Sequence, residues 1–156
     1  MKGPPMRISK AFTLLLASLL LTMIGSSETS HANPPVLPNP VLYLTATEPF
    51  SRGGVDYIRY KYDVMNKDAY PDAMFAAAPA LAPCGANKNS ARTWVDIFDQ
   101  RGKRLYGFCA LGKANDLGSI WFAAPESEVP PSWIYIELND RETNTKYKSN
   151  LADTTF

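Results

Sequence analysis

The chain has 156 residues, with 16 basic and 15 acidic side chains and a single histidine, His31. Residues 1–32 have the layout of a secretory signal peptide: basic residues, an apolar run (AFTLLLASLLLTMI), and small residues before the expected cleavage after Ala32. Cleavage would leave 13 basic and 14 acidic side chains and no histidine. We therefore expect a secreted or periplasmic protein without histidine chemistry. Binding to nucleic acid or anionic membranes through charge is disfavoured.

Proline content divides the rest of the chain. Residues 33–40 (NPPVLPNP) hold four prolines and are expected to form a short extended spacer. A single domain is predicted over residues 41–150, followed by a C-terminal tail at 151–156. No second apolar segment is long enough to cross a membrane, so no membrane span is expected in the processed chain.

Short segments of alternating apolar and polar residues dominate the domain, as is typical of half-buried β-strands. Tyr57–Met65 shows the pattern best, because charged residues separate Ile58, Tyr60, Tyr62 and Val64. Further strands are predicted at Val41–Thr47, Thr93–Phe98, Arg104–Leu111, Ser119–Ala123, Trp133–Asn139 and Thr145–Ser149. Prolines bracket and interrupt the Ala-rich segment Ala73–Ala82, which is expected to be a strand or irregular loop, or to include a helical turn. About seven to eight strands predict an all-β fold, a single antiparallel β-sandwich.

Two cysteines, Cys84 and Cys109, remain after the signal peptide. An isolated pair in an oxidising compartment is expected to form a disulfide. Closing a loop of this length would stabilise the fold by about 3–4 kcal/mol if the gain is entropic. The chain has no Asn-x-Ser/Thr sequence, which favours a bacterial exported protein over a eukaryotic one.

One hairpin can be drawn residue by residue. Asp99–Lys103 has the sequence of a type I turn followed by Gly102 in a left-handed conformation. Pairing Asp99 with Lys103 predicts a core side with the pairs Ile97–Leu105, Val95–Gly107 and Thr93–Cys109. The opposite side would carry the pairs Trp94–Phe108, Asp96–Tyr106 and Phe98–Arg104.

That second side is unusually aromatic for a sheet surface that faces solvent. We predict that Trp94, Tyr106 and Phe108 form a binding face for a protein or a sugar ring, with Asp96 as a polar contact. Two alternatives stay open: the faces are inverted, or Ala76–Ala78 of the Ala-rich segment covers the rings. Two other tryptophans on or beside strands, Trp121 and Trp133, are expected in the core.

Patterns for catalysis or metal binding are weak. Nothing in the sequence brings together the two carboxylate pairs, Asp96 with Asp99 and Glu137 with Asp140, as a glycosidase would require. Oxygen ligands for calcium could come from Asn115-Asp116 or from Asn139–Glu142, but neither has the spacing of a known calcium loop. Ser-x-x-Lys, Gly-x-Ser-x-Gly and phosphate-binding glycine motifs are lacking. We predict no enzymatic activity, no cofactor and no metal site.

In strand number and size, residues 41–150 resemble the broad immunoglobulin and fibronectin type III-like group. Trp94 lies between Cys84 and Cys109, as a tryptophan lies between two sheet cysteines in immunoglobulin domains, although the spacing here is shorter. The segment CGANKNSARTWVDIFDQRGKRLYGFCAL also resembles small exported bacterial proteins of unassigned function. The resemblance implies a rigid β-sandwich frame and assigns no functional residue.

Together these features predict an exported, non-enzymatic binding module that recognises an envelope or extracellular protein, or a glycan, through an aromatic sheet face. Two other classes stay open. A secreted hydrolase inhibitor would act through a loop such as Ala82–Ser90 or Gly112–Gly118. A structural or assembly subunit would pair through the edges of its sheets.

Overall fold

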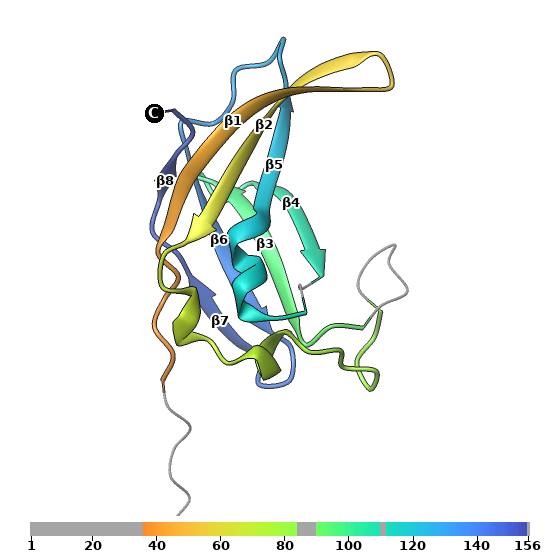
Figure 1. The fold of residues 1–156 in the computed structure, drawn as a ribbon, viewed down its shortest axis with the longest axis vertical. Helices are drawn as coiled ribbons and strands as arrows, with labels where there is room; N and C mark the ends of the chain where they lie inside the picture. Colours follow the sequence, from red (N-terminus) through yellow and green to blue (C-terminus); the bar gives the residue numbers. More distant parts are fainter. Residues whose placement is uncertain (1–35, 84–89, 110–111, 156) are drawn as a thin grey trace, which may run out of the picture. The chain divides into compact units, whose positions relative to one another are not determined.

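The computed structural model describes residues 36–83, 90–109 and 112–155, and Figure 1 shows their arrangement. Within these ranges, eight strands form two antiparallel sheets. The three-stranded sheet has the order β1 (Leu42–Arg52), β2 (Val55–Val64), β5 (Ile120–Pro125). The five-stranded sheet has the order β4 (Arg104–Cys109), β3 (Thr93–Asp99), β6 (Trp133–Asp140), β7 (Thr145–Lys148), and β8 (Ala152–Asp153) also pairs with β6. The prediction of an all-β fold with two antiparallel sheets is confirmed.

The three-stranded sheet begins with a long hairpin. Strand β1 extends five residues beyond its predicted end because Gly53 and Gly54, both with positive φ, close a two-residue turn between Arg52 and Val55. Two successive residues with positive φ suit the right-handed twist of a hairpin. The alternation predicted for β2 is also confirmed, since Tyr60, Tyr62 and Val64 are buried.

One core lies between the two sheets. The five-stranded sheet contributes apolar residues from β3 and β6, and the three-stranded sheet contributes them from β1, β2 and β5; fully buried members are Leu42, Tyr62, Val64, Val95, Ile97, Ile120, Ile134, Ile136 and Leu138. Three short 3-10 helices complete the architecture: Lys67–Ala69, Asp72–Phe75 and Ala114–Ser119. The Ala-rich segment therefore begins with a helical turn, which buries Met74 and Phe75 in the core, before the isolated bridge between Ala77 and Ala91.

A buried ion pair ties the start of β3 to the end of β6. Asp140 is 3% exposed, and its carboxylate accepts hydrogen bonds from Arg92 Nε at 2.9 Å and Nη2 at 2.6 Å. Burial alone would raise the pKa of Asp140, but hydrogen bonds from Arg92, Thr143 and Glu142 outweigh it and the pKa is lowered. Asp140, one of the candidate calcium ligands, is therefore already paired with the guanidinium of Arg92.

The predicted hairpin register is correct at the turn and wrong beyond it. Asp99 and Lys103 are hydrogen-bonded and Phe98 pairs with Arg104, as expected. A β-bulge then shifts the register by one residue, so that Ile97 pairs with Tyr106, Asp96 with Gly107 and Val95 with Phe108. A bulge of this kind moves every later side chain of β4 to the opposite face.

Both flanks of the predicted domain take part in the fold. Leu37 packs against the core, and the carbonyl of Pro38 accepts a hydrogen bond from Tyr70 at 2.6 Å. The predicted tail contains β8, in which Ala152 is buried and pairs with Ile134. Residues on both sides of the predicted 41–150 domain therefore contact it, and the predicted boundaries stay a prediction.

The predicted disulfide and signal peptide concern residues outside the described ranges. Cys109 ends β4 and is not a free cysteine, whereas Cys84 and residues 1–35 are not described, so both predictions stay predictions. No helix in the described ranges is long and apolar enough to cross a membrane.

Candidate binding site: an aromatic groove beside strand β5

The bulge separates the four residues predicted to form one binding face. Trp94 and Asp96 lie on the outer face of the five-stranded sheet, where Trp94 Nε1 donates to Asp96 Oδ1 at 2.6 Å. Arg104 Nε donates to the same oxygen at 2.5 Å, and its guanidinium lies 5.5 Å from the Trp94 ring. A Cβ at Gly107 would overlap the ends of the Arg104 and Asp96 side chains, so a larger residue there would displace this contact. Trp94, Asp96 and Arg104 therefore contact one another on this outer face.

Tyr106 and Phe108 lie on the inner side of β4, paired with Ile97 and Val95 of the core. Their neighbours Ile97 and Val95 are 0% exposed, yet Tyr106 is 49% exposed and Phe108 is partly exposed. Strand β4 is the edge of its sheet, and the three-stranded sheet ends at β5. The inner face of β4 is therefore left without full cover, which is the feature that creates the site.

Trp121 of β5 stands next to this uncovered face. Its indole lies 6.3 Å from the Tyr106 ring, with an interplanar angle of 21°, and 6.4 Å from Phe50. Phe50 in turn stacks on Tyr57 at 5.3 Å. The aromatic row (Tyr57, Phe50, Trp121, Tyr106 and Phe108) thus runs from the outer face of the three-stranded sheet, round the edge of β5, to β4.

Arg59 holds the row in place. Its guanidinium lies 4.5 Å from the Phe50 ring and 4.7 Å from the Trp121 ring, and Nη1 donates to Glu48 at 2.9 Å. Glu48 also pairs with Lys61 at 3.0 Å, and these two cations lower its pKa. A cation between two aromatic faces stabilises both rings in one orientation.

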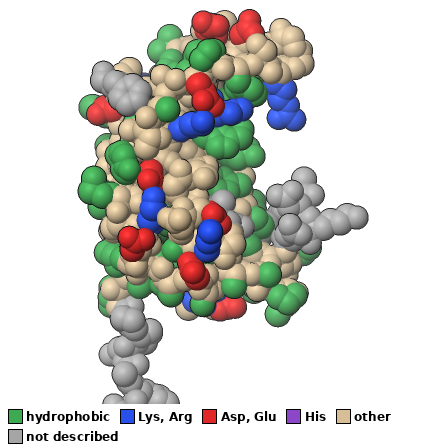
Figure 2. Space-filling model, in the orientation of Figure 1, with side chains coloured by type: hydrophobic (Ala, Val, Ile, Leu, Met, Phe, Trp, Pro, Cys, Tyr) green, Lys and Arg blue, Asp and Glu red, His purple; other side chains and the backbone are tan. Residues whose placement is uncertain are grey.

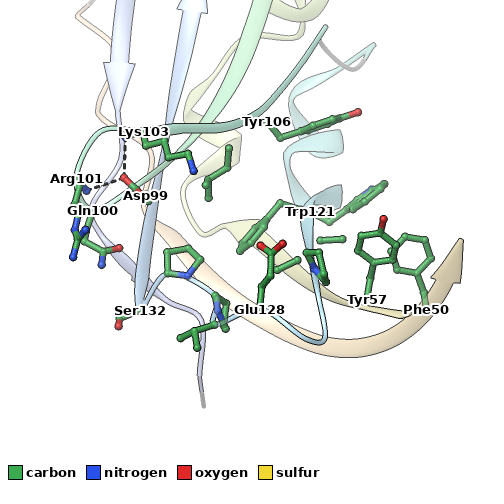
Figure 3. Close-up of a pocket in the computed structure, with 18 of the residues that line it drawn as sticks. Phe50, Tyr57, Asp99, Gln100, Arg101, Lys103, Tyr106, Trp121, Glu128 and Ser132 are labelled. Carbon is green, nitrogen blue, oxygen red and sulfur yellow. Dashed lines mark hydrogen bonds between the residues drawn. The ribbon is translucent and has the colours of Figure 1, made fainter. Parts of the chain in front are cut away.

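A groove of about 650 Å³ opens beside this row, and Figure 3 shows the residues that line it. One wall is β5, from Trp121 to Pro125, and the other walls are the β3–β4 turn and the β5–β6 connection at residues 128–132. In the space-filling view, hydrophobic side chains gather over β4 and β5, with charged side chains beside them (Figure 2).

Charged side chains are also part of the groove lining. Arg52, Arg101 and Lys103 form no ion pair among the described residues. Two carboxylates are present, of which Asp99 already accepts hydrogen bonds from the backbone of Arg101 and Lys103. The other, Glu128, points into the groove (Figure 3). The groove lining therefore carries a small excess of positive charge.

A smaller hollow of about 150 Å³ continues the groove toward the start of β5. Its lining is Tyr106, Phe108, Ser119 and Trp121. A cavity of this volume is large enough for one aromatic ring or one branched aliphatic side chain.

Both tryptophans expected in the core are surface residues, and that prediction is wrong. Trp121 is 39% exposed, and Trp133 is exposed with its indole donating to Asp153. Alternation within β5 indicates this for Trp121, because Ile120 and Phe122 on either side of it are buried. The general preference of tryptophan for burial does not apply to Trp121, because the alternation of β5 places its side chain outward.

The described residues contain no group of three or more His, Cys, Asp or Glu side chains placed to hold a metal ion. The first candidate calcium segment is engaged locally: Asp116 accepts hydrogen bonds from the backbone of Gly112 and Lys113. In the second segment, Asp140 is paired with Arg92.

No protein-family model and no curated protein sequence matches this chain. Among solved structures, the human pre-T cell receptor is similar, with a TM-score of 0.42 and 13% identity over 73% of this chain and 97% of that chain. At that score and identity the likeness identifies neither a family nor a function.

Proposed function

We propose that this chain is an exported, non-enzymatic binding module and that its ligand is another protein, held in the groove beside β5. The observation that carries the proposal is the exposure of Tyr106 and Trp121 beside a groove of about 650 Å³. Clustered exposed aromatics at a concave site are typical of interaction surfaces, where they supply much of the binding free energy.

The setting of Trp121 favours a protein over a glycan. A sugar ring stacks on an open aromatic face, but here Arg59 lies over the indole from the β2 side and Tyr106 lies against it from the β4 side. The exposed part of Trp121 is thus offered to a side chain that enters between strands. A branched or aromatic side chain fits the 150 Å³ hollow beside it.

The other two classes have less support. In the proposed inhibitor loop Gly112–Gly118, Leu117 is 0% exposed and Ala114 is also buried, so this segment does not protrude as an inhibitory loop would. The other loop, Ala82–Ser90, lies mostly outside the described residues. For an enzyme, the groove would have to supply reactive groups, and one of its two carboxylates is already bound by the β3–β4 turn.

The test compares two tryptophans. The full-length chain, produced in an exporting host and immobilised, is exposed to extracellular extract of the native source, and captured proteins are then purified and titrated individually. Trp121→Ala should weaken the binding of the purified partner at least tenfold. Trp94→Ala is the matched control, because Trp94 belongs to the self-contained outer face, and it should leave affinity within twofold.

Equal affinity for both variants would refute the groove as the binding site. Loss of affinity in Trp94→Ala alone would instead restore the outer face as the site. If a purified glycan binds the chain and no captured protein competes with it, the assignment of a protein ligand would be refuted. Circular dichroism and unfolding curves of both variants confirm that each is folded.

A further inference from the structure

The sheet edges of this protein differ in how well they are protected. Strand β1 has a bulge after Leu44 together with Glu48 and Pro49, and β4 has the bulge beside Arg104. The remaining edge is formed by the short strands β7 and β8, with Lys146 and Lys148 on β7. Bulges, charges, proline and short length are the usual means by which an exposed strand is kept from pairing with another chain.

Strand β5 has none of these features along its length until Pro125. Its sequence, IWFAAP, has no charge, and its six residues pair with β2 without a bulge. The backbone of Glu126 donates to Asp56 at 2.9 Å, and in an antiparallel ladder such hydrogen-bonded positions alternate. Phe122 and Ala124 therefore bond to β2, and the N–H and C=O groups of Trp121 and Ala123 point away from it. Among the described strands, β5 pairs with β2 alone.

The five-stranded sheet extends one strand further than the three-stranded sheet on this side. Leu105, Tyr106 and Phe108 of β4 face inward but are only partly buried, whereas Val95 and Ile97 on the neighbouring strand are 0% exposed. A fourth strand placed beside β5 would lie over these three residues, with the Tyr106 ring displaced from its contact with Trp121 at the strand edge. It would satisfy the outward groups of Trp121 and Ala123 at the same time.

We propose that β5 accepts one extended segment of a partner protein as the fourth strand of the three-stranded sheet. This inference rests on the proposed function and specifies how the groove holds its ligand. Backbone hydrogen bonds to β5 supply affinity, and side chains that alternate toward β4 supply specificity. One large apolar side chain fills the hollow between Tyr106 and Trp121. An acidic side chain of the segment meets one of the cations that line the groove, Arg52, Arg101 or Lys103, which have no ion pair among the described residues.

A second copy of this chain does not fit the same place. Its β5 would arrive with its own five-stranded sheet packed against the same face. The space beneath the new strand already holds β4 and Tyr106 of the first copy. The overhang of β4 therefore favours a single segment with no second layer behind it.

The experiment uses random twelve-residue peptides displayed on phage and selected on the immobilised full-length chain. Selected sequences should share β-branched residues, one large apolar residue, and an Asp or Glu two or four positions from it. A synthetic copy of the best peptide should bind Ala123→Pro at least tenfold more weakly, because proline removes the outward N–H. Ala123→Ser, which keeps that N–H, should bind within twofold of the unchanged chain.

Hydrogen exchange keeps the test independent of whether Ala123→Pro folds. In the unchanged chain, the amides of Trp121 and Ala123 should exchange fast when free and at least tenfold more slowly with the peptide bound, while Phe122 is protected in both states. If a peptide binds but the amides of Trp121 and Ala123 stay unprotected, strand addition would be overturned. If Trp121→Ala still weakens binding of that peptide, the groove would remain supported as the binding site. Strand addition by a partner segment would also be overturned if no peptide were selected, or if a concentration-dependent dimer of this chain protected the same amides.

Discussion

The outer face of the five-stranded sheet and the groove beside β5 both present aromatic rings. On the outer face these rings and their polar neighbours contact one another, whereas in the groove much of the aromatic surface is exposed. On the outer face, Trp94, Asp96 and Arg104 bind one another around Gly107. In the groove, Tyr106 and Trp121 touch one another and leave much of their surface, and a strand edge, without a partner. Aromatic content alone therefore does not locate a binding site. What distinguishes the proposed site is exposed aromatic surface and an unpaired strand edge that no other described part of the chain covers.

Substitutions in the five-stranded sheet should reduce stability, and a large loss is expected at Arg92. Arg92→Met would leave Asp140 buried without its cation, and removing one member of such a pair costs about 3–5 kcal/mol in unfolding free energy. Urea unfolding at pH 7 measures the loss. Glu142→Gln is the control, because Glu142 touches the same guanidinium at 3.1 Å but is exposed, and it should cost less than about 1 kcal/mol.

The same pair predicts a pH dependence. The pKa of Asp140 lies below its ordinary value of 3.8, so the pair contributes full stability above that pH and loses it as pH falls through the lowered pKa. Without Arg92, burial would raise the pKa of Asp140 and favour its neutral form. The stability gap between the unchanged chain and Arg92→Met should therefore shrink between pH 7 and pH 3. A gap that stays constant over this range would contradict the assignment.

A smaller loss is expected at Gly107. Gly107→Ala places a methyl group where the ends of Arg104 and Asp96 meet, and loss of this largely exposed contact costs about 0.5–1 kcal/mol. Thermal unfolding and tryptophan fluorescence would report the change, because Trp94 loses its hydrogen-bonded neighbour. Gly112→Ala is the matched control, since the nearest atom to its new Cβ lies 3.9 Å away, and its stability should be unchanged. Equal effects at the two glycines would mean that the outer face is not tightly packed.

The smallest effect on stability is expected in the groove itself. Tyr106→Ser should change the unfolding free energy by less than about 1 kcal/mol, as is usual for surface positions. Its cross-strand partner gives the contrast, because Ile97→Ala empties a fully buried site and should cost about 2–5 kcal/mol. Tyr106→Ser should nonetheless weaken the selected peptide at least tenfold in a titration. A stability loss equal to that of Ile97→Ala would show that Tyr106 belongs to the core.

Local signals in the sequence predicted much of the fold. Alternation located β2 and β3, and the Asp99–Lys103 turn predicted where the hairpin reverses. The bulge between Ile97 and Phe98 could not be predicted, because local alternation carries no information on contacts between strands such as that of Arg104 with Asp96. That single residue of shift moved Tyr106 and Phe108 away from Trp94 and so changed the site.

The groove depends on which strands end each sheet. Trp121 and Tyr106 lie in different strands of different sheets, and they meet because β4 and β5 both form edges on the same side. Edge position follows from the pairing of the whole chain, which short-range alternation does not encode. The outward direction of Trp121 could be obtained from its buried neighbours, but its partner across the sheets could not.

Hydrogen bonds join the first strand, β1, to residues near the C-terminus of the domain. The side chain of Asn150 accepts a hydrogen bond from the backbone of Leu42 at 2.7 Å and donates one back at 3.0 Å, across 108 positions of sequence. Tyr62 likewise donates to the carbonyl of Asp153. Folds rich in contacts of such long range fold more slowly than folds built from local contacts. Residues 150–153 must therefore be synthesised before these hydrogen bonds to β1 and β2 can form, so the three-stranded sheet acquires them only when the domain is nearly complete.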